Sequence, residues 1–183
     1  MKSVKVFLFS LALSSNILAA PSGVYVEAGL GIGLKDKINT KNADYFYDRD
    51  FLGSLAIGYQ MNLYRVEIES RYKKDTIVSQ GNISAKGDLT KSTQMLNVYY
   101  SGYNSSRLVS TVGLGVGLSS VTLDTQNLED SAIFTYQGIF SVGYRNTENI
   151  TTSLKYNYVR FESSDNFDIN SDHLVTLNLR YLF

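Results

Sequence analysis

Apolar and polar residues alternate strictly over the last ten positions of the chain, residues 174–183. Polar side chains fill the gaps of an apolar series that consists of Val175, Leu177, Leu179, Tyr181 and Phe183. Successive side chains of a β-strand point to opposite faces, so this spacing predicts a strand with one apolar and one polar face.

Seven further stretches show the same two-residue period, at about residues 24–34, 51–61, 63–73, 92–100, 107–120, 132–145 and 150–161. Long polar segments and short links alternate between them. The long segments are 35–49, 75–90, 124–130 and 162–172, and the short links are 62, 101–106 and 146–149. Short turns on one side and long loops on the other are typical of bacterial outer-membrane barrels.

The strand lengths fit a membrane, because ten residues that rise ~3.4 Å each at a tilt of ~40° span about 26 Å, close to the ~25 Å apolar band of such barrels. We therefore predict an all-β fold, an eight-stranded antiparallel up-and-down transmembrane barrel. A soluble, lipocalin-like barrel would instead turn its apolar face inward. Tyrosines near the strand ends fit a membrane-interface girdle and favour the transmembrane orientation; they are Tyr59, Tyr64, Tyr100, Tyr144 and Tyr181.

The first twenty residues change the boundaries of the domain. Lys2 and Lys5 precede a short apolar run at residues 6–13, and small residues follow at Ala19 and Ala20. This is the pattern of a secretory signal peptide, and the run is too short to span a bilayer. We expect a signal peptide at 1–20 and a barrel domain at 21–183, with cleavage after Ala19 or Ala20.

Composition excludes several function classes. The chain has no cysteine, so we expect no disulfides. Its 17 basic and 17 acidic residues cancel, which disfavours a nucleic-acid partner because such a partner requires a net basic face. After residue 20 no segment is long and apolar enough for a membrane helix, so a membrane location requires a closed barrel.

Four segments resemble the small outer-membrane β-barrel family, which includes the membrane domain of OmpA, OmpX and the opacity proteins. They are MLNVYYSG at 95–102, FTYQGIFSVGYRNTENI at 134–150, LKYNYVRF at 154–161 and LVTLNLRYLF at 174–183. The resemblance implies a monomer in the outer membrane of a Gram-negative bacterium, surrounded by outer-membrane lipids and lipopolysaccharide. It also implies that the barrel-assembly machinery reads the chain's end, through Leu177, Leu179, Tyr181 and Phe183.

The alternation places eight charged residues on the inner face: Glu27, Arg65, Glu67, Glu69, Arg71, Lys73, Lys155 and Arg180. An unpaired buried charge is costly, so we expect these residues to pair and plug the lumen. Glu27 is expected to meet Arg180 or Asn178 across the closing seam. Glycines at 29–33 and 113–117 are expected to leave room for the long side chains of 63–73. The alternative is a narrow pore lined by the same charges.

The remaining candidates for chemistry are few. His173 is the single histidine and follows Ser171 and Asp172, but on a strand Asp172 points away from the other two, so we expect no catalytic site. A barrel enzyme that acts on lipid through His173 is the less favoured alternative. We likewise expect no cofactor and no metal site. Tyr45, Phe46 and Tyr47 form either a contact patch in the first long loop or part of an aromatic girdle. We expect a structural or surface role, such as envelope integrity, adhesion or display of a surface antigen, exercised through four extracellular loops.

Overall fold

The computed structural model describes residues 22–34, 39–40, 43–79, 87–103, 107–123, 128–162 and 171–183. Within these ranges, the side chains of 39–50, 75–89 and 123–132 are not described. The expected signal peptide at 1–20 lies outside the described residues. The strands are β1 (Gly23–Leu34), β2 (Asn39–Thr40), β3 (Ala43–Met61), β4 (Tyr64–Ser79), β5 (Gly87–Tyr103), β6 (Leu108–Leu123), β7 (Leu128–Arg145), β8 (Ile150–Phe161) and β9 (Ser171–Leu182).

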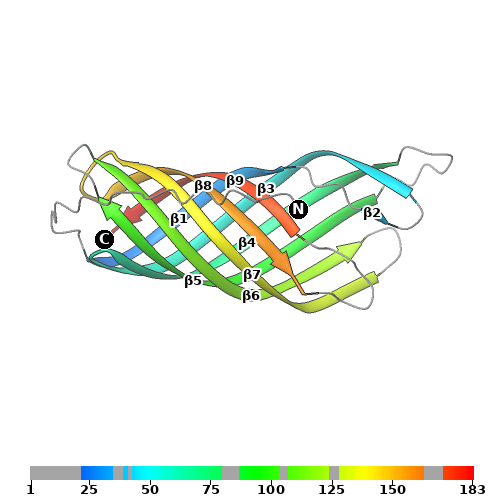
Figure 1. Cartoon of the computed structure of the whole chain (residues 1–183), viewed down its shortest axis with the longest axis horizontal. Helices are drawn as coiled ribbons and strands as arrows, with labels where there is room; N and C mark the ends of the chain where they lie inside the picture. The colour runs from blue at the N-terminus through cyan, green and yellow to red at the C-terminus, as the bar shows by residue number, and fades with distance from the viewer. Residues whose placement is uncertain are drawn as a thin grey trace, which may run out of the picture.

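Eight of these strands close into a barrel, and the two-residue β2 adds only to the edge of β3 (Figure 1). β1 pairs with both β3 and β9, and every neighbouring pair is antiparallel. The predicted up-and-down barrel is confirmed. Following paired residues once around the barrel from Tyr144 leads back to β7 at Phe134, ten residues away. This stagger requires the strands to tilt steeply against the barrel axis.

The apolar face of the barrel is the outer one. Leu55 and Leu114 are 69% and 68% exposed, whereas the carboxylate-bearing Glu67 is 1% exposed. A water-soluble barrel would show the reverse order, so the predicted transmembrane orientation is confirmed. Within the described part of the chain, no helix is long and apolar enough to cross a membrane.

Five strands, β3 to β7, reach beyond their predicted bounds at the same end. β3 begins at Ala43, β4 continues to Ser79, β5 begins at Gly87, β6 continues to Leu123 and β7 begins at Leu128. At this end β9 also begins three residues early, at Ser171. The predicted polar loops 35–49, 75–90, 124–130 and 162–172 are therefore wrong in part, because part of each is strand. Two-residue alternation marks a strand with one face in lipid, and a strand that stands in water on both faces need not alternate.

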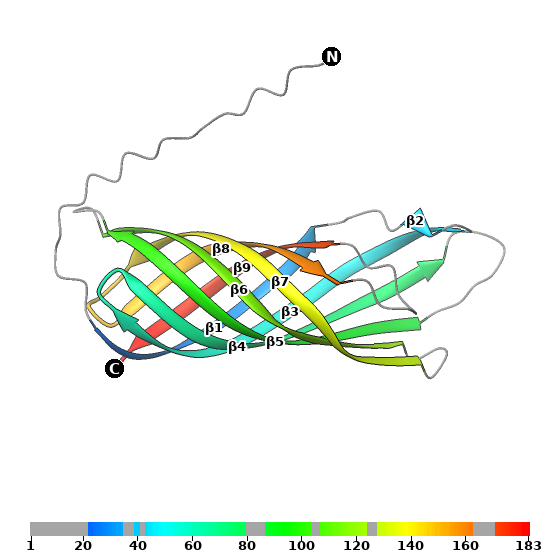
Figure 2. The same cartoon turned by 60° about the horizontal axis from the view of Figure 1, so that its bottom comes forward.

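The extension gives the barrel an uneven rim. At the end opposite the C-terminus, β3 to β7 reach beyond the ends of β1, β8 and β9 (Figures 1 and 2). The last pairing between β1 and β3 is Gly31 with Leu52, while β3 and β4 remain paired as far as Tyr45 with Ser79. We call the part of β3 to β7 above this level the extended wall.

The opposite end carries the short connections. Asn62 joins β3 to β4 with a φ of 52°, and Arg107 precedes β6 with a φ of 65°. Asparagine tolerates this left-handed conformation well. The link between β7 and β8 is closed by a hydrogen bond from the Asn146 amide to the Ile150 carbonyl, at 2.9 Å. Because outer-membrane barrels carry their short turns on the periplasmic side, we expect this end to face the periplasm and the extended wall to face outward, and we call the two ends periplasmic and outer accordingly.

The glycines make room for adjacent strands, and not for the strand that we expected. A Cβ at Gly115 would lie 2.0 Å from Asn97 Oδ1, and one at Gly113 would lie 2.4 Å from Tyr99 Cδ1. Both neighbours belong to β5. The expectation that these glycines accommodate the side chains of 63–73 is therefore wrong, because long inward side chains lean sideways over the adjacent strand.

Candidate functional site: the lumen

The structure places all eight charged residues of the expected lumen network inside the barrel. They come from β1, β4, β8 and β9, and each is at most 7% exposed: Glu27, Arg65, Glu67, Glu69, Arg71, Lys73, Lys155 and Arg180. Strand alternation alone aims them inward, because the opposite face is held in lipid. Their contacts divide the lumen into three layers.

The first layer, near the periplasmic end, centres on Glu27. Lys155 Nζ lies 2.6 Å from Glu27 Oε1, and Arg65 Nη1 lies 3.7 Å from Oε2. Arg180 is the register partner of Glu27 on β9, yet no ion pair joins them within the described residues. Glu27 and Arg180 therefore lie opposite each other across the seam, as expected, but the close ion pair of Glu27 is with Lys155 on β8.

Glu67 is the most connected carboxylate of this layer. Tyr25 donates a hydrogen bond to Glu67 Oε2 at 2.7 Å, and Tyr99 donates one to Oε1. Asn97 Nδ2 donates to Oε1 at 3.1 Å, and Lys155 Nζ lies 3.9 Å from the same oxygen. The guanidinium of Arg65 lies 4.5 Å from the centroid of the Tyr99 ring.

The second layer lies further along β4. Arg71 Nη2 donates to Glu69 Oε1 at 2.9 Å and to Gln137 Oε1 at 3.0 Å. Gln137 Nε2 donates to Asn97 Oδ1 at 2.8 Å, and Asn97 Nδ2 donates to Glu69 Oε2 at 2.9 Å. These bonds close a continuous polar network from β4 through β5 to β7.

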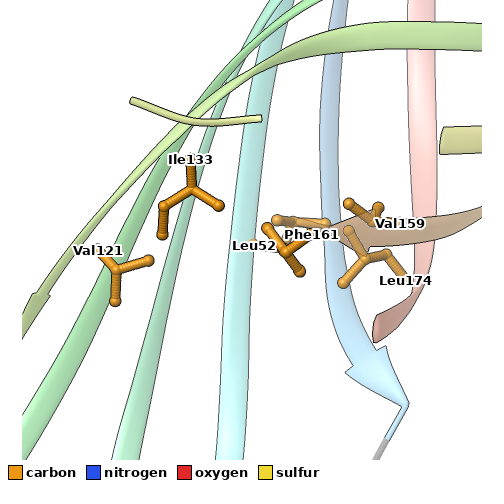
Figure 3. Packing of buried hydrophobic residues seen from close by; sticks show 6 residues of the cluster. All are labelled: Leu52, Val121, Ile133, Val159, Phe161 and Leu174. Atoms are coloured by element: carbon orange, nitrogen blue, oxygen red, sulfur yellow. The ribbon is translucent and has the colours of Figure 1, made fainter. Parts of the chain in front are cut away.

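The third layer, at the outer end, combines an ion cluster with apolar packing. Asp172 Oδ2 lies 3.0 Å from Lys91 Nζ and 3.5 Å from Lys73 Nζ. Inward-facing apolar side chains gather at the same end (Figure 3); they are Leu52, Val121, Ile133, Val159, Phe161 and Leu174. Lys91 Nζ lies 5.2 Å from the centroid of the Phe161 ring, which joins the two groups.

Several of these residues were not predicted as part of the site. Tyr25, Tyr99, Asn97 and Gln137 are uncharged, and only their inward parity could have identified them. Lys91 and Asp172 were assigned to the polar loops 75–90 and 162–172 or their margins, whereas both lie in strands, β5 and β9. The residues around these strand ends do not alternate between apolar and polar, so the sequence does not indicate that Lys91 and Asp172 point inward.

The other candidate residues lie away from the lumen. His173 Nδ1 is 2.5 Å from the hydroxyl of Tyr156 on the outer surface, whereas Asp172 points inward to the two lysines. Within the described residues no group of three or more His, Cys, Asp or Glu side chains could hold a metal ion.

Tyr45, Phe46 and Tyr47 lie in β3 and not in a loop, with Tyr45 paired to Ser79, so the prediction of a loop at these residues is wrong. All four residues of the expected assembly signal face outward; they are Leu177, Leu179, Tyr181 and Phe183.

Comparison with known proteins agrees with this geometry. The sequence profile of the outer membrane protein beta-barrel domain matches residues 6–183. The fold is similar to Neisserial surface protein A (NspA), with a TM-score of 0.69 and 16% identity over 88% of this chain and 98% of that one. It is also similar to OprG of Pseudomonas aeruginosa, with a TM-score of 0.60 and 14% identity over 90% and 98%.

A third similar structure is Ail of Yersinia pestis, solved with the heparin analogue sucrose octasulfate. Its TM-score is 0.54, with 12% identity over 88% of this chain and 97% of that one. No curated protein matches the chain by sequence. At these identities the similar structures support the fold and carry no information about a ligand.

Proposed function

Because the chain belongs to the outer membrane protein beta-barrel family, which places it in the cell outer membrane, we propose that it is a closed, non-enzymatic barrel that presents a surface to the outside. The observation that carries this proposal is the network of buried, paired charges inside the barrel. Glu67, in the first layer of the lumen, is 1% exposed and contacts partners on three other strands. Eight-stranded barrels have just enough interior for side chains, so such a network leaves little room for a water path.

The apolar group at the outer end supports the same proposal. Leu52, Phe161, Val159 and Leu174 lie together across the lumen (Figure 3). Ions would have to shed water to pass this layer as well as break the charged network below it. A narrow porin-like channel is the alternative function, and it requires both layers to open.

Conductance decides between these two functions. We expect the folded, full-length barrel to give no steady conductance in planar lipid bilayers, because both lumen layers remain closed. Heat-modifiable migration of the same preparation on a gel serves as the control that the protein is folded. A steady conductance from the folded wild-type protein would contradict the closed barrel and support the channel.

We further propose that the extended wall is the surface through which the protein meets host or other surface ligands. Tyr45, Phe46 and Tyr47 lie in this wall on β3, and clustered aromatic residues often mark contact sites. The eight residues 43–50 of β3 give the wall a length of roughly 27 Å along the strand. We also propose lipopolysaccharide as a partner. The barrel-assembly machinery is a second proposed partner, which would bind Phe183 at the end of the chain.

The absence of cysteine allows a direct test of this surface. We expect Tyr45→Cys and Phe46→Cys to react with a membrane-impermeant maleimide on intact cells, because both positions lie beyond the last pairing of β3 with β1, in the part of the wall that we propose to face the outside. Glu148→Cys, in the turn between β7 and β8, is the matched control and should react only after the outer membrane is permeabilised. Labelling of Glu148→Cys alone on intact cells would reverse the proposed orientation.

A further inference from the structure

A groove runs over the lipid-facing surface of the barrel where β9, β1, β3 and β4 lie side by side. Its volume is about 710 Å³, and four outward-facing leucines line it; they are Leu30, Leu55, Leu177 and Leu179. Each of these leucines is at least 56% exposed, so the groove opens toward the membrane and not into the lumen. Because this surface stands in the apolar band, the groove meets the hydrocarbon chains of lipids.

Small residues make the groove hollow. Ala28 pairs with Leu55 between β1 and β3, and Gly53 pairs with Leu30. A Cβ on Gly53 would have its nearest neighbour, Phe51 Cε1, at 4.0 Å, so the space above this glycine is open. The missing side chain leaves a depression between leucines, and a flexible chain of methylene groups can fill it.

A hydrogen-bonded polar pair lies beside the groove on the same outward face. Gln94 Nε2 on β5 donates to Ser70 Oγ on β4 at 2.8 Å, and Ser70 also lines the groove. Exposed apolar side chains border this pair on three sides; they are Leu55, Leu118, Ile68 and Leu96. The polar pair therefore interrupts an apolar surface.

The depth of the pair places it in the outer half of the membrane. Tyr64 begins β4 at the periplasmic end, and Ser70 lies six positions further on, roughly 20 Å along the strand. At a tilt of ~40° this distance covers about 15 Å of the ~25 Å apolar band. Lipids of the outer leaflet therefore surround Ser70 and Gln94.

The pair has hydrogen-bonding capacity that the protein does not use. A glutamine side chain has two N–H donors and an acceptor oxygen, and a serine hydroxyl both donates and accepts. Among the described residues, the side chains of Gln94 and Ser70 bond only to each other. Unsatisfied polar groups are costly in lipid, so a polar group of a neighbouring lipid is the partner available to them.

Toward the outer end, the same face becomes polar and then positively charged. Ser92 is exposed on β5 beside Tyr72, and Lys74 is exposed on β4 four positions beyond Ser70. From the groove outward, the surface thus offers hydrocarbon contact, then hydrogen bonds, then a positive charge. A membrane lipid has the complementary order, because its acyl chain is followed by ester or hydroxyl groups and then by phosphate.

We propose that this surface binds the lipid A part of lipopolysaccharide. One acyl chain lies in the groove over Gly53, an ester or hydroxyl group at the head of the chain bonds to Ser70 and Gln94, and a phosphate lies near Lys74. The inference rests on the lipopolysaccharide partner proposed above and assigns it to the barrel wall within the membrane. A phospholipid of the inner leaflet would carry its ester groups at the opposite end of β4, near Tyr64.

Native mass spectrometry tests the site on the folded full-length protein in detergent, with lipid A and phosphatidylethanolamine added in equal amounts. We expect the wild-type protein to bind one lipid A in preference to phosphatidylethanolamine. Gly53→Leu should lower the affinity for lipid A by about tenfold or more, because the new side chain occupies the groove. Gly138→Leu is the matched control, since an added Cβ at this outward glycine of β7 also meets no atom within 4 Å and Gly138 lies outside the groove.

Gln94→Leu tests the polar pair without filling the groove. It should weaken lipid A binding by about three- to tenfold, because it removes a hydrogen bond to the lipid. Binding of phosphatidylethanolamine should change less, since that lipid is not expected to use the pair. Heat-modifiable migration on a gel confirms that each variant is folded before its binding is measured.

Three results would overturn the proposal. Unchanged lipid A binding in both Gly53→Leu and Gln94→Leu would leave lipopolysaccharide as a partner but place it elsewhere on the protein. Equal binding of the two lipids by the wild-type protein would remove the preference for lipid A. A dimer that Gly53→Leu dissociates would assign the groove to a second copy of the chain. None of these results bears on the closed lumen, which the conductance measurement tests separately.

Discussion

Replacing Lys155 with methionine is expected to lower the free energy of unfolding by about 3–5 kcal/mol, because it removes one partner from a buried ion network. Lys155 Nζ lies 2.6 Å from Glu27 and 3.9 Å from Glu67, and the lysine is 3% exposed. Without it, these carboxylates must take up protons or remain buried with less positive charge. Urea unfolding of the barrel in lipid vesicles measures the loss.

A double-mutant cycle separates the ion pair from the packing of the lysine stem. Lys155→Met combined with Glu27→Gln should recover part of the lost stability, because the uncompensated carboxylate is then absent. Lys74→Met is the control at an exposed position of β4 and should change stability by less than about 1 kcal/mol. A loss below about 1 kcal/mol for Lys155→Met would show that water reaches this part of the lumen and would weaken the closed-barrel proposal.

The second large effect is expected on the outer surface, where Leu114→Arg should destabilise the barrel by about 2–4 kcal/mol in a lipid bilayer. Leu114 lies in the middle of β6 and is 68% exposed, so the arginine would enter the apolar centre of the membrane. The same urea titration in vesicles measures this cost. The expected sign depends only on which face of the strand meets lipid.

Leu108→Arg on the same strand is the matched control. Leu108 is the first residue of β6, beside a short turn, and Leu114 lies six positions further on, roughly 20 Å along the strand. At the membrane interface the cost of arginine falls to about 0–1 kcal/mol. Equal costs at the two positions would contradict the placement of the apolar belt across the middle of β6.

The direction of each lumen side chain could be predicted from the sequence because lipid enforces the two-residue period. Glu67 and Arg180 occupy gaps between apolar residues, and the structure turns both of them inward. The predicted strand at 150–161 coincides with β8, whereas β5 continues to Tyr103, three residues into the predicted link 101–106.

The outer strand ends could not be predicted, because the constraint imposed by lipid ends at the membrane surface. Lys91 and Asp172 form an ion pair inside the barrel, yet the residues around them are polar on both faces. The partners of each charge were equally inaccessible. Glu27 lies opposite Arg180 in the register, as expected, but its close ion pair is with Lys155, two strands away on β8. The apolar–polar alternation indicates which face of the strand a residue occupies, but not how far neighbouring strands are shifted along one another.

The extended wall relaxes the requirements on its own sequence. Beyond the last pairings of β3 with β1 and of β7 with β8, at Leu52 and Thr135, the closed cylinder becomes an open, curved sheet (Figure 2). Only the base of that sheet contributes to the lumen, through Val121 and Ile133, whereas a residue within the closed barrel must face either lipid or the lumen. We therefore expect substitutions in the wall beyond these two residues to affect folding less than substitutions in the closed barrel, so that the wall can change in sequence while the barrel keeps its form.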